Sequence, residues 1–209
     1  MDSIKQYFKK HPVIFMLLYT AVYFIIFLLL EIAVEPKFII HSPIDDLIPF
    51  CEYFIVPYLM WFLYVPLVLF YLLCNDRASF WSMVKMMFVG NMLCLLIYAV
   101  FPNGVMPKKP VYNDNIFAHM VNILYYTDTP TNVCPSIHVL DTLSAHIALS
   151  RSVYVRENHI VKLTSFMFFI MVCISTVTLK QHSILDIFAS LFLMVFLERY
   201  AYSKKPIQI

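Results

Sequence analysis

The segment Val13–Leu30, VIFMLLYTAVYFIIFLLL, is an unbroken apolar run preceded by Lys5, Lys9 and Lys10. It approaches the roughly 20 residues that a helix needs to cross the hydrocarbon core of a bilayer. No cleavage pattern of small residues follows it, so we expect a retained signal-anchor helix rather than a signal peptide that is removed. This segment places the chain in a membrane.

The rest of the chain has the same character. Of its 209 residues, 61% are apolar and only 13% are charged, whereas about a quarter of a soluble domain is charged. Further apolar blocks lie near Phe54–Leu73, Met83–Val100, Ile137–Ser152, Ile160–Leu179 and Ile184–Tyr202. We predict an all-α, polytopic membrane bundle of about six transmembrane helices, with residues 1–209 forming one domain.

The block at 137–152 is the most polar, because it contains Asp141, Thr142, Ser144 and His146. Polar and ionisable residues in a membrane almost always face protein or water. We therefore expect this helix to face protein or water rather than lipid.

Basic residues set the expected orientation. The side of the N-terminus receives most of them, and the other side receives only Lys37, Lys108, Lys109 and Lys180. Positive residues are retained on the cytoplasmic side, so we predict a multi-pass protein of the cell membrane with both termini cytoplasmic. The net charge of +2 then gives no reason to expect a nucleic-acid partner.

In this topology the long connections, about 35–53 and 101–135, are extracytoplasmic. Residues 115–126 have apolar side chains at helical spacing and predict a short interfacial helix. Cys51 and Cys134 both lie on this side, where a disulfide is chemically feasible, and the spacing leaves their pairing open. We expect no metal or other cofactor, because no CxxC or His-rich tract is present. Only two glycines occur, which argues against a Rossmann or P-loop phosphate cradle.

The first piece of sequence that indicates chemistry is Cys134-Pro135-Ser136-Ile137-His138, where the outer loop enters the polar helix. Pro followed by Ser is a helix-start signal, and a helix N-terminus offers free N–H groups to a phosphate. His138 would lie beside that position and could protonate a leaving oxygen. Ser136 is a candidate phosphate ligand.

The second piece runs from Ser175 to Asp186. His182 and Asp186 are four residues apart, so on a helix they share a face. The carboxylate can accept the Nδ1–H of the imidazole and leave Nε2 as a nucleophile, as in a catalytic triad. Ser175 ends the preceding helix on the same side and could bind a phosphate oxygen. Asp186, His182 and His138 are therefore the predicted catalytic residues.

The third piece is the outer loop around Lys108 and Lys109. Phosphoryl transfer requires positive charge around the equatorial oxygens, and with Lys180 these residues are the available cations. We predict that all three lysines bind substrate.

At these residues the chain resembles the type 2 phosphatidic acid phosphatase superfamily, whose second and third signatures read PSGH and SRxxxxxHxxxD. The counterparts are Pro135-Ser136-Ile137-His138 and Ser175-Thr176-x5-His182-x3-Asp186, within a core of about 101–203. The resemblance implies six spans, an outer active site and a phosphohistidine at His182.

The departures from the family pattern concern phosphate binding. Ile137 replaces glycine, and Thr176 replaces an arginine. The first signature, KxxxxxxRP, is met only by Lys109-Pro110, with Pro102 at its lysine position. Such forms, together with the acidic stretch 41–50, resemble the branch that contains fungal inositol phosphorylceramide synthase.

Three functions follow from these patterns. The leading one is a lipid phosphatase that hydrolyses a phospholipid or isoprenyl phosphate, either a monoester or a diphosphate. The alternative is a phosphotransferase that moves a phospho-headgroup to a lipid alcohol. The third is a non-catalytic membrane scaffold or a lipid transporter. The headgroup and the oligomeric state are not readable from the residues.

Overall fold

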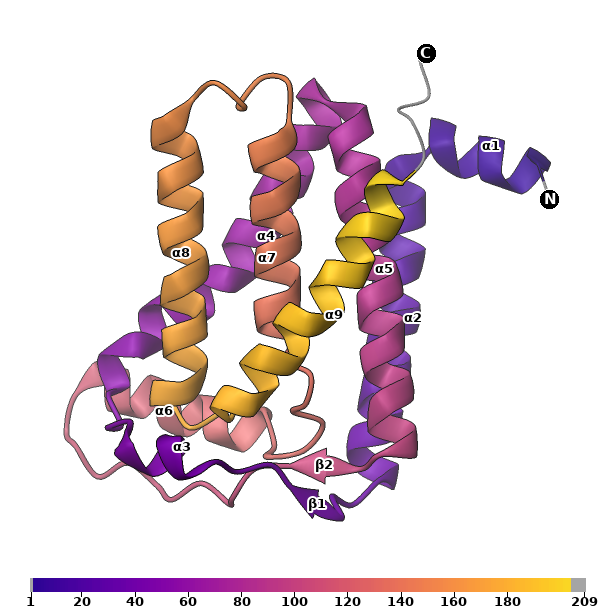
Figure 1. Cartoon of the computed structure of the whole chain (residues 1–209). Helices are drawn as coiled ribbons and strands as arrows, with labels where there is room; N and C mark the ends of the chain where they lie inside the picture. Colours follow the sequence, from indigo (N-terminus) through magenta and orange to yellow (C-terminus); the bar gives the residue numbers. More distant parts are fainter. Residues whose placement is uncertain (1, 204–209) are drawn as a thin grey trace.

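The computed structural model describes residues 2–203, and the chain is an all-α helical bundle, as predicted (Figure 1). The long elements are α2 (Pro12–Ala33), α4 (Ile55–Asn75), α5 (Arg77–Val100), α7 (Ile137–Arg151), α8 (His159–Thr178) and α9 (Ile184–Tyr202). The short ones are α1 (Asp2–Lys10), β1 (Phe38–Ile39), α3 (Pro43–Leu47), the 3₁₀ turn η1 (Glu52–Phe54), β2 (Asn103–Gly104) and α6 (Ile116–Thr127).

Among the described helices, four are long and apolar enough to cross a membrane: α2, α4 with η1, α5 and α8. The other two predicted spans are helices of the same bundle but do not meet that standard. Helix α7 has 15 residues, about 22 Å at 1.5 Å per residue, which is short of the roughly 30 Å hydrocarbon core. Helix α9 carries Asp186, Glu198 and Arg199.

Helix α7 lies at the centre of the bundle and contacts α4, α5, α8 and α9. Its polar side chains are satisfied in part by its neighbours. Asn91 of α5 donates from Nδ2 to Tyr19 Oη at 2.9 Å and to Asp141 Oδ2 at 3.3 Å, and Asp141 is 4% exposed. The expectation that this helix faces protein is confirmed.

The two ends of the bundle differ in construction (Figure 1). Helices α3 and α6 and the strands β1 and β2 gather at one end, which we call the loop end, while α1 and the C-terminal end of α9 lie at the other. The predicted interfacial helix is present as α6. All five cysteines are free, Cys51 and Cys134 included.

The charge asymmetry of the sequence coincides with these two ends. Lys108 and Lys180 belong to the loop end, because Lys108 Nζ donates to Asp128 O after α6 and Lys180 Nζ donates to Asp45 O of α3. Lys9 and Lys10 of α1 and Arg199, in the last turn of α9, belong to the opposite end. The predicted separation of basic residues therefore follows the long axis of the bundle.

Gly90 of α5 lies where this helix packs closely against α7 and α9. A Cβ atom at this position would lie 2.6 Å from Leu140 Cδ2 of α7 and 2.9 Å from Leu197 Cδ1 of α9. Both contacts are shorter than side chains tolerate, so these two buried leucines must shift if residue 90 gains a side chain.

We expect Gly90→Ala to lower the free energy of unfolding by about 1–3 kcal/mol, because the two leucines must leave their rotamers. Thermal unfolding of the detergent-solubilised protein measures the change. Leu96→Ala, at a lipid-facing side chain of the same helix that is 59% exposed, serves as the control and should change it by less than about 0.5 kcal/mol. Equal effects of the two substitutions would contradict the packing argument.

Candidate active site

The loop between α8 and α9 is fixed by a helix-ending motif. The N–H of Gln181 donates to Thr176 O at 2.9 Å and the N–H of Lys180 donates to Val177 O at 3.2 Å. This is the Schellman pattern, in which the residue after the cap takes a left-handed conformation. Here that residue is Lys180, with φ 54°, so a lysine occupies a position that favours glycine. The motif turns the chain sharply and presents His182.

Helix α9 begins with a capping box whose acidic member is also the partner of His182. Ser183 Oγ accepts from Leu185 N, and Asp186 Oδ2 accepts from Ser183 N at 3.0 Å. The same Oδ2 lies 3.1 Å from His182 Nδ1, and the Asp186 side chain is fully buried. The predicted pair is therefore in contact, and one carboxylate both caps the helix and orients the imidazole.

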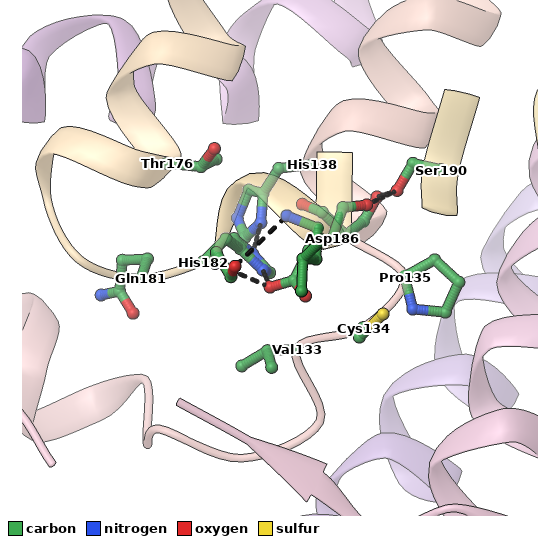
Figure 2. A network of polar contacts seen from close by, with 12 residues as sticks. Val133, Cys134, Pro135, His138, Thr176, Gln181, His182, Asp186 and Ser190 are labelled. Carbon is green, nitrogen blue, oxygen red and sulfur yellow. Dashed lines mark hydrogen bonds and ion pairs between the residues drawn. The ribbon is translucent and has the colours of Figure 1, made fainter. Parts of the chain in front are cut away.

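His138 lies in the first turn of α7, next to His182 (Figure 2). His182 Nε2 is 3.4 Å from His138 Nδ1, and the ring centroids are 5.6 Å apart. The ring of His138 is also held by two aromatic rings of α4, Tyr58 and Trp61, each with its centroid at 4.6 Å. Segments far apart in the sequence thus bring two imidazoles together.

The helices that carry the two histidines are joined directly. Ser190 Oγ of α9 donates to Ser136 O at 2.9 Å, and Ser136 N donates to Asp186 O at 3.5 Å (Figure 2). The start of α7 is therefore bonded to the first turns of α9. This contact fixes the distance between His138 and His182.

The loop that leads into α7 is organised by Asn103 of β2. Its Oδ1 accepts from the N–H groups of Val133 and Cys134, and its Nδ2 donates to Phe101 O and Cys134 O. The N–H of Asn132 donates to the backbone oxygen of Asn103 as well. A single buried amide therefore holds the segment that presents Ser136 and His138.

A cavity of about 290 Å³ adjoins the two histidines. Its polar wall comes from the loop end of the bundle, and its apolar wall comes from α2 and α4. The polar lining residues are Glu31, Asp128, Thr129, Asn132, His138, Gln181 and His182, among others. The sequence predicts a catalytic core of about 101–203, but residues before position 101 also line this cavity.

The two predicted serine ligands do not line this cavity. Ser175 is fully buried, and its Oγ donates to Val172 O at 2.7 Å inside α8. Ser136 is also fully buried, and its Oγ has no hydrogen-bond partner among residues 2–203. Ser136 lies at the predicted helix start, whereas the hydroxyl of Ser175 is turned back into its own helix.

The three lysines are placed differently from one another. Lys109 is exposed. Lys180 Nζ donates to the backbone oxygens of Asp45, at 2.8 Å, and Ile48, at 2.5 Å, so it binds the α3 segment and not the cavity. Lys108 Nζ donates to Asp128 O at 3.1 Å and to Gln181 Oε1. Only Lys108 lies next to residues of the cavity wall.

Burial lowers the pKa of Lys108 to about 8, although the nearby carboxylates Asp128 and Glu31 oppose the shift. Burial, followed by the charge of Asp186, raises the pKa of Cys134 to about 12. Cys134 is therefore a thiol at neutral pH, and a thiol is a weak nucleophile. The nucleophile candidate of the site is an imidazole.

Sequence reasoning missed the residue that holds the His182 turn from outside, Asp45 of α3. Its Oδ2 accepts from Ser183 Oγ at 2.5 Å and its Oδ1 accepts from Ile184 N at 2.9 Å. Burial opposes the charged form, but bonds from Ser183, Ile184 and Ser42 outweigh it and hold the pKa of Asp45 below its usual value. The sequence shows that the stretch 41–50 is acidic, but it does not show that Asp45 binds Ser183 and Ile184, which are more than 130 residues away.

Among residues 2–203, no group of three or more His, Cys, Asp or Glu side chains could hold a metal ion. No protein-family model, curated protein or solved structure matches this chain.

We expect Asp45→Ala to lower the free energy of unfolding by about 1–3 kcal/mol, because it leaves buried donors of the His182 turn without an acceptor. Amide hydrogen exchange at residues 180–186 should become faster than in the parent protein. Asp46→Ala is the matched control, since Asp46 is exposed and bonds only to His41 in this structure. Unchanged exchange in the Asp45 variant would show that the turn holds without this carboxylate.

Proposed function

We propose that the protein is a membrane lipid phosphatase that works through a phosphohistidine at His182. The observation that carries this proposal is the array Asp186–His182–His138 beside a cavity walled by apolar helices. A carboxylate that orients one imidazole leaves its second nitrogen free to attack. A second imidazole within hydrogen-bonding reach of the first can exchange protons with the substrate.

In the first half of the reaction, the lone pair of His182 Nε2 attacks phosphorus. The bond from phosphorus to the lipid oxygen breaks, and that oxygen takes a proton from the imidazolium form of His138, which becomes a neutral imidazole. Asp186 accepts the Nδ1–H of His182 and stabilises the positive charge that forms on the ring. The present 3.4 Å contact between the two imidazoles must open, because the phosphoryl group takes its place.

In the second half, His138 accepts a proton from water, and the water oxygen attacks the phosphohistidine. The phosphorus–nitrogen bond breaks, His182 recovers its lone pair, and inorganic phosphate leaves. The same residue thus serves as acid and then as base, as microscopic reversibility requires.

The apolar wall of the cavity supports a lipid as the substrate. Phe24 and Leu28 of α2 and Phe62 of α4 line it, and each is more than half exposed. Both helices are long and apolar enough to cross a membrane. A lipid tail can therefore lie along lipid-facing helices while its phosphate reaches the histidines.

The sidedness of the site is part of the same proposal. The histidines lie toward the loop end, and the positive-inside rule assigns that end to the extracytoplasmic side. The resemblance to the type 2 phosphatidic acid phosphatase superfamily agrees with this arrangement through Pro135-Ser136-x-His138 and His182-x3-Asp186.

We expect His182→Gln to abolish release of phosphate from phosphatidic acid, lysophosphatidic acid or an isoprenyl diphosphate without changing thermal unfolding. His138→Gln should lose turnover of these lipids but still react with p-nitrophenyl phosphate, whose leaving group needs no protonation. Because His138 is also the base for water, that variant should accumulate a ³²P-labelled, acid-labile phosphohistidine.

Label on any residue other than His182, or turnover by the His182 variant, would contradict the assignment. The same assay, repeated with an added lipid alcohol, identifies the molecule that accepts the phosphoryl group. Labelled phosphate that stays free identifies a phosphatase, whereas label transferred to the lipid alcohol identifies the phosphotransferase.

The activity should also decrease as pH rises through about 8, the pKa to which burial lowers Lys108. Lys108 is charged below that pH and neutral above it, so its support for a bound phosphate is lost on the alkaline side. Lys108→Arg, whose guanidinium stays charged, should move this limb of the pH profile of kcat/KM upward. If the alkaline side of the pH profile stays at the same pH in the arginine variant, the loss of activity is due to the titration of another group.

A further inference from the structure

Three buried N–H donors without a partner belong to residues that line the cavity. Trp61 Nε1, Asn132 Nδ2 and Gln181 Nε2 have no hydrogen-bond acceptor among residues 2–203, and all three residues line the cavity beside the histidines. Asn132 is 6% exposed and Gln181 is 3% exposed. A buried unpaired donor costs about 1–3 kcal/mol, so three of them around one cavity call for an acceptor that binds there.

The orientation of the Gln181 amide is fixed by its neighbour. Lys108 Nζ donates to Gln181 Oε1, and an ammonium group can only donate. The oxygen of the amide must therefore face Lys108, and the NH₂ group is left for another acceptor. Lys108 also polarises the amide, which strengthens that donor.

The indole of Trp61 and the backbone of Asn132 are also held in place. An indole nitrogen can only donate, and the Trp61 ring is held against His138 with centroids 4.6 Å apart. Asn132 is in a left-handed conformation, with φ 57°, and its backbone N–H is bonded to Asn103 O at 2.8 Å. Sparsely populated backbone conformations of this kind cluster at ligand sites.

The start of α7 adds backbone donors on the same side. Ile137 and His138, in its first turn, line the cavity, and the first N–H groups of a helix have no acceptor within it. No lysine or arginine among the described residues is part of the cavity lining. The carboxylates in the lining already have donors, because Asp128 Oδ2 accepts from Tyr58 Oη and Glu31 Oε1 accepts from Thr129 Oγ1. The donors left for an anion in this cavity are therefore neutral, with the charge of Lys108 behind Gln181.

We propose that Trp61, Asn132 and Gln181 are the phosphate-binding residues of this protein, forming with the start of α7 a cradle for the oxygens of a phosphoryl group. This inference rests on the proposed function for the identity of the anion. The cradle replaces the arginine forks that the signature positions lack: Thr176, at one of them, donates from Oγ1 to Cys173 O at 2.8 Å and is fully buried.

The test is the binding of inorganic phosphate to the detergent-solubilised full chain, measured by titration calorimetry. Trp61→Phe removes the indole N–H and keeps an aromatic ring on His138. Gln181→Leu removes the amide, and Asn132→Gly removes the amide while permitting the left-handed backbone. Each variant should weaken phosphate binding about tenfold.

Trp81→Phe is the matched control, because it makes the same chemical change at the only other tryptophan of the chain. Trp81 packs against Phe15 of α2 and does not line the cavity, so its variant should bind phosphate as the parent does. A second arm repeats the titrations with a short-chain phosphatidic acid in the His182→Gln background. Tighter binding there than for inorganic phosphate identifies a lipid phosphate as the ligand.

Unchanged phosphate affinity in all three variants, or no binding by the parent protein, would overturn the cradle. These outcomes are separate from failure of the proposed function, which is read from turnover and phosphohistidine. If the protein binds phosphate through the three donors but forms no phosphohistidine, the phosphate-binding proposal stands and the proposed reaction is wrong.

Discussion

The site depends on one buried carboxylate. Asp186 accepts from the Ser183 N–H and lies 3.1 Å from His182 Nδ1, both through Oδ2, and it is fully buried. An ionised carboxylate in such a place is costly unless it is hydrogen-bonded. The start of α9 and the imidazole supply those bonds together, so the same carboxylate oxygen holds both the beginning of the helix and the orientation of the ring.

The parts of the site that could be predicted are local in sequence. The spacing of His182 and Asp186 follows from the helical repeat, and Pro135-Ser136 marks a helix start by its own chemistry. The apolar blocks likewise gave the fold class and four helices of membrane-spanning character. The separation of α7 from lipid was readable because its polar residues are unsuited to lipid.

The parts that could not be predicted are contacts between distant segments. The three lysines look alike in sequence, yet Lys180 satisfies carbonyl oxygens near α3 and only Lys108 approaches the cavity wall. Asp45 and Trp61 reach the site from elements in the first third of the chain. Neither has a spacing that relates it to the histidines, because the packing of helices and not the local repeat brings them together.

Asn103 has a consequence for how this chain can change over evolutionary time. An amide offers two donors and two acceptor sites, and bonds to Phe101, Val133 and Cys134 use all four. Aspartate would lack the donors, and glutamine would be longer by a methylene group. No other side chain offers the same donors and acceptors at this length. We therefore expect substitutions at position 103 to be rejected in evolution, whereas residues on the lipid-facing surface can vary.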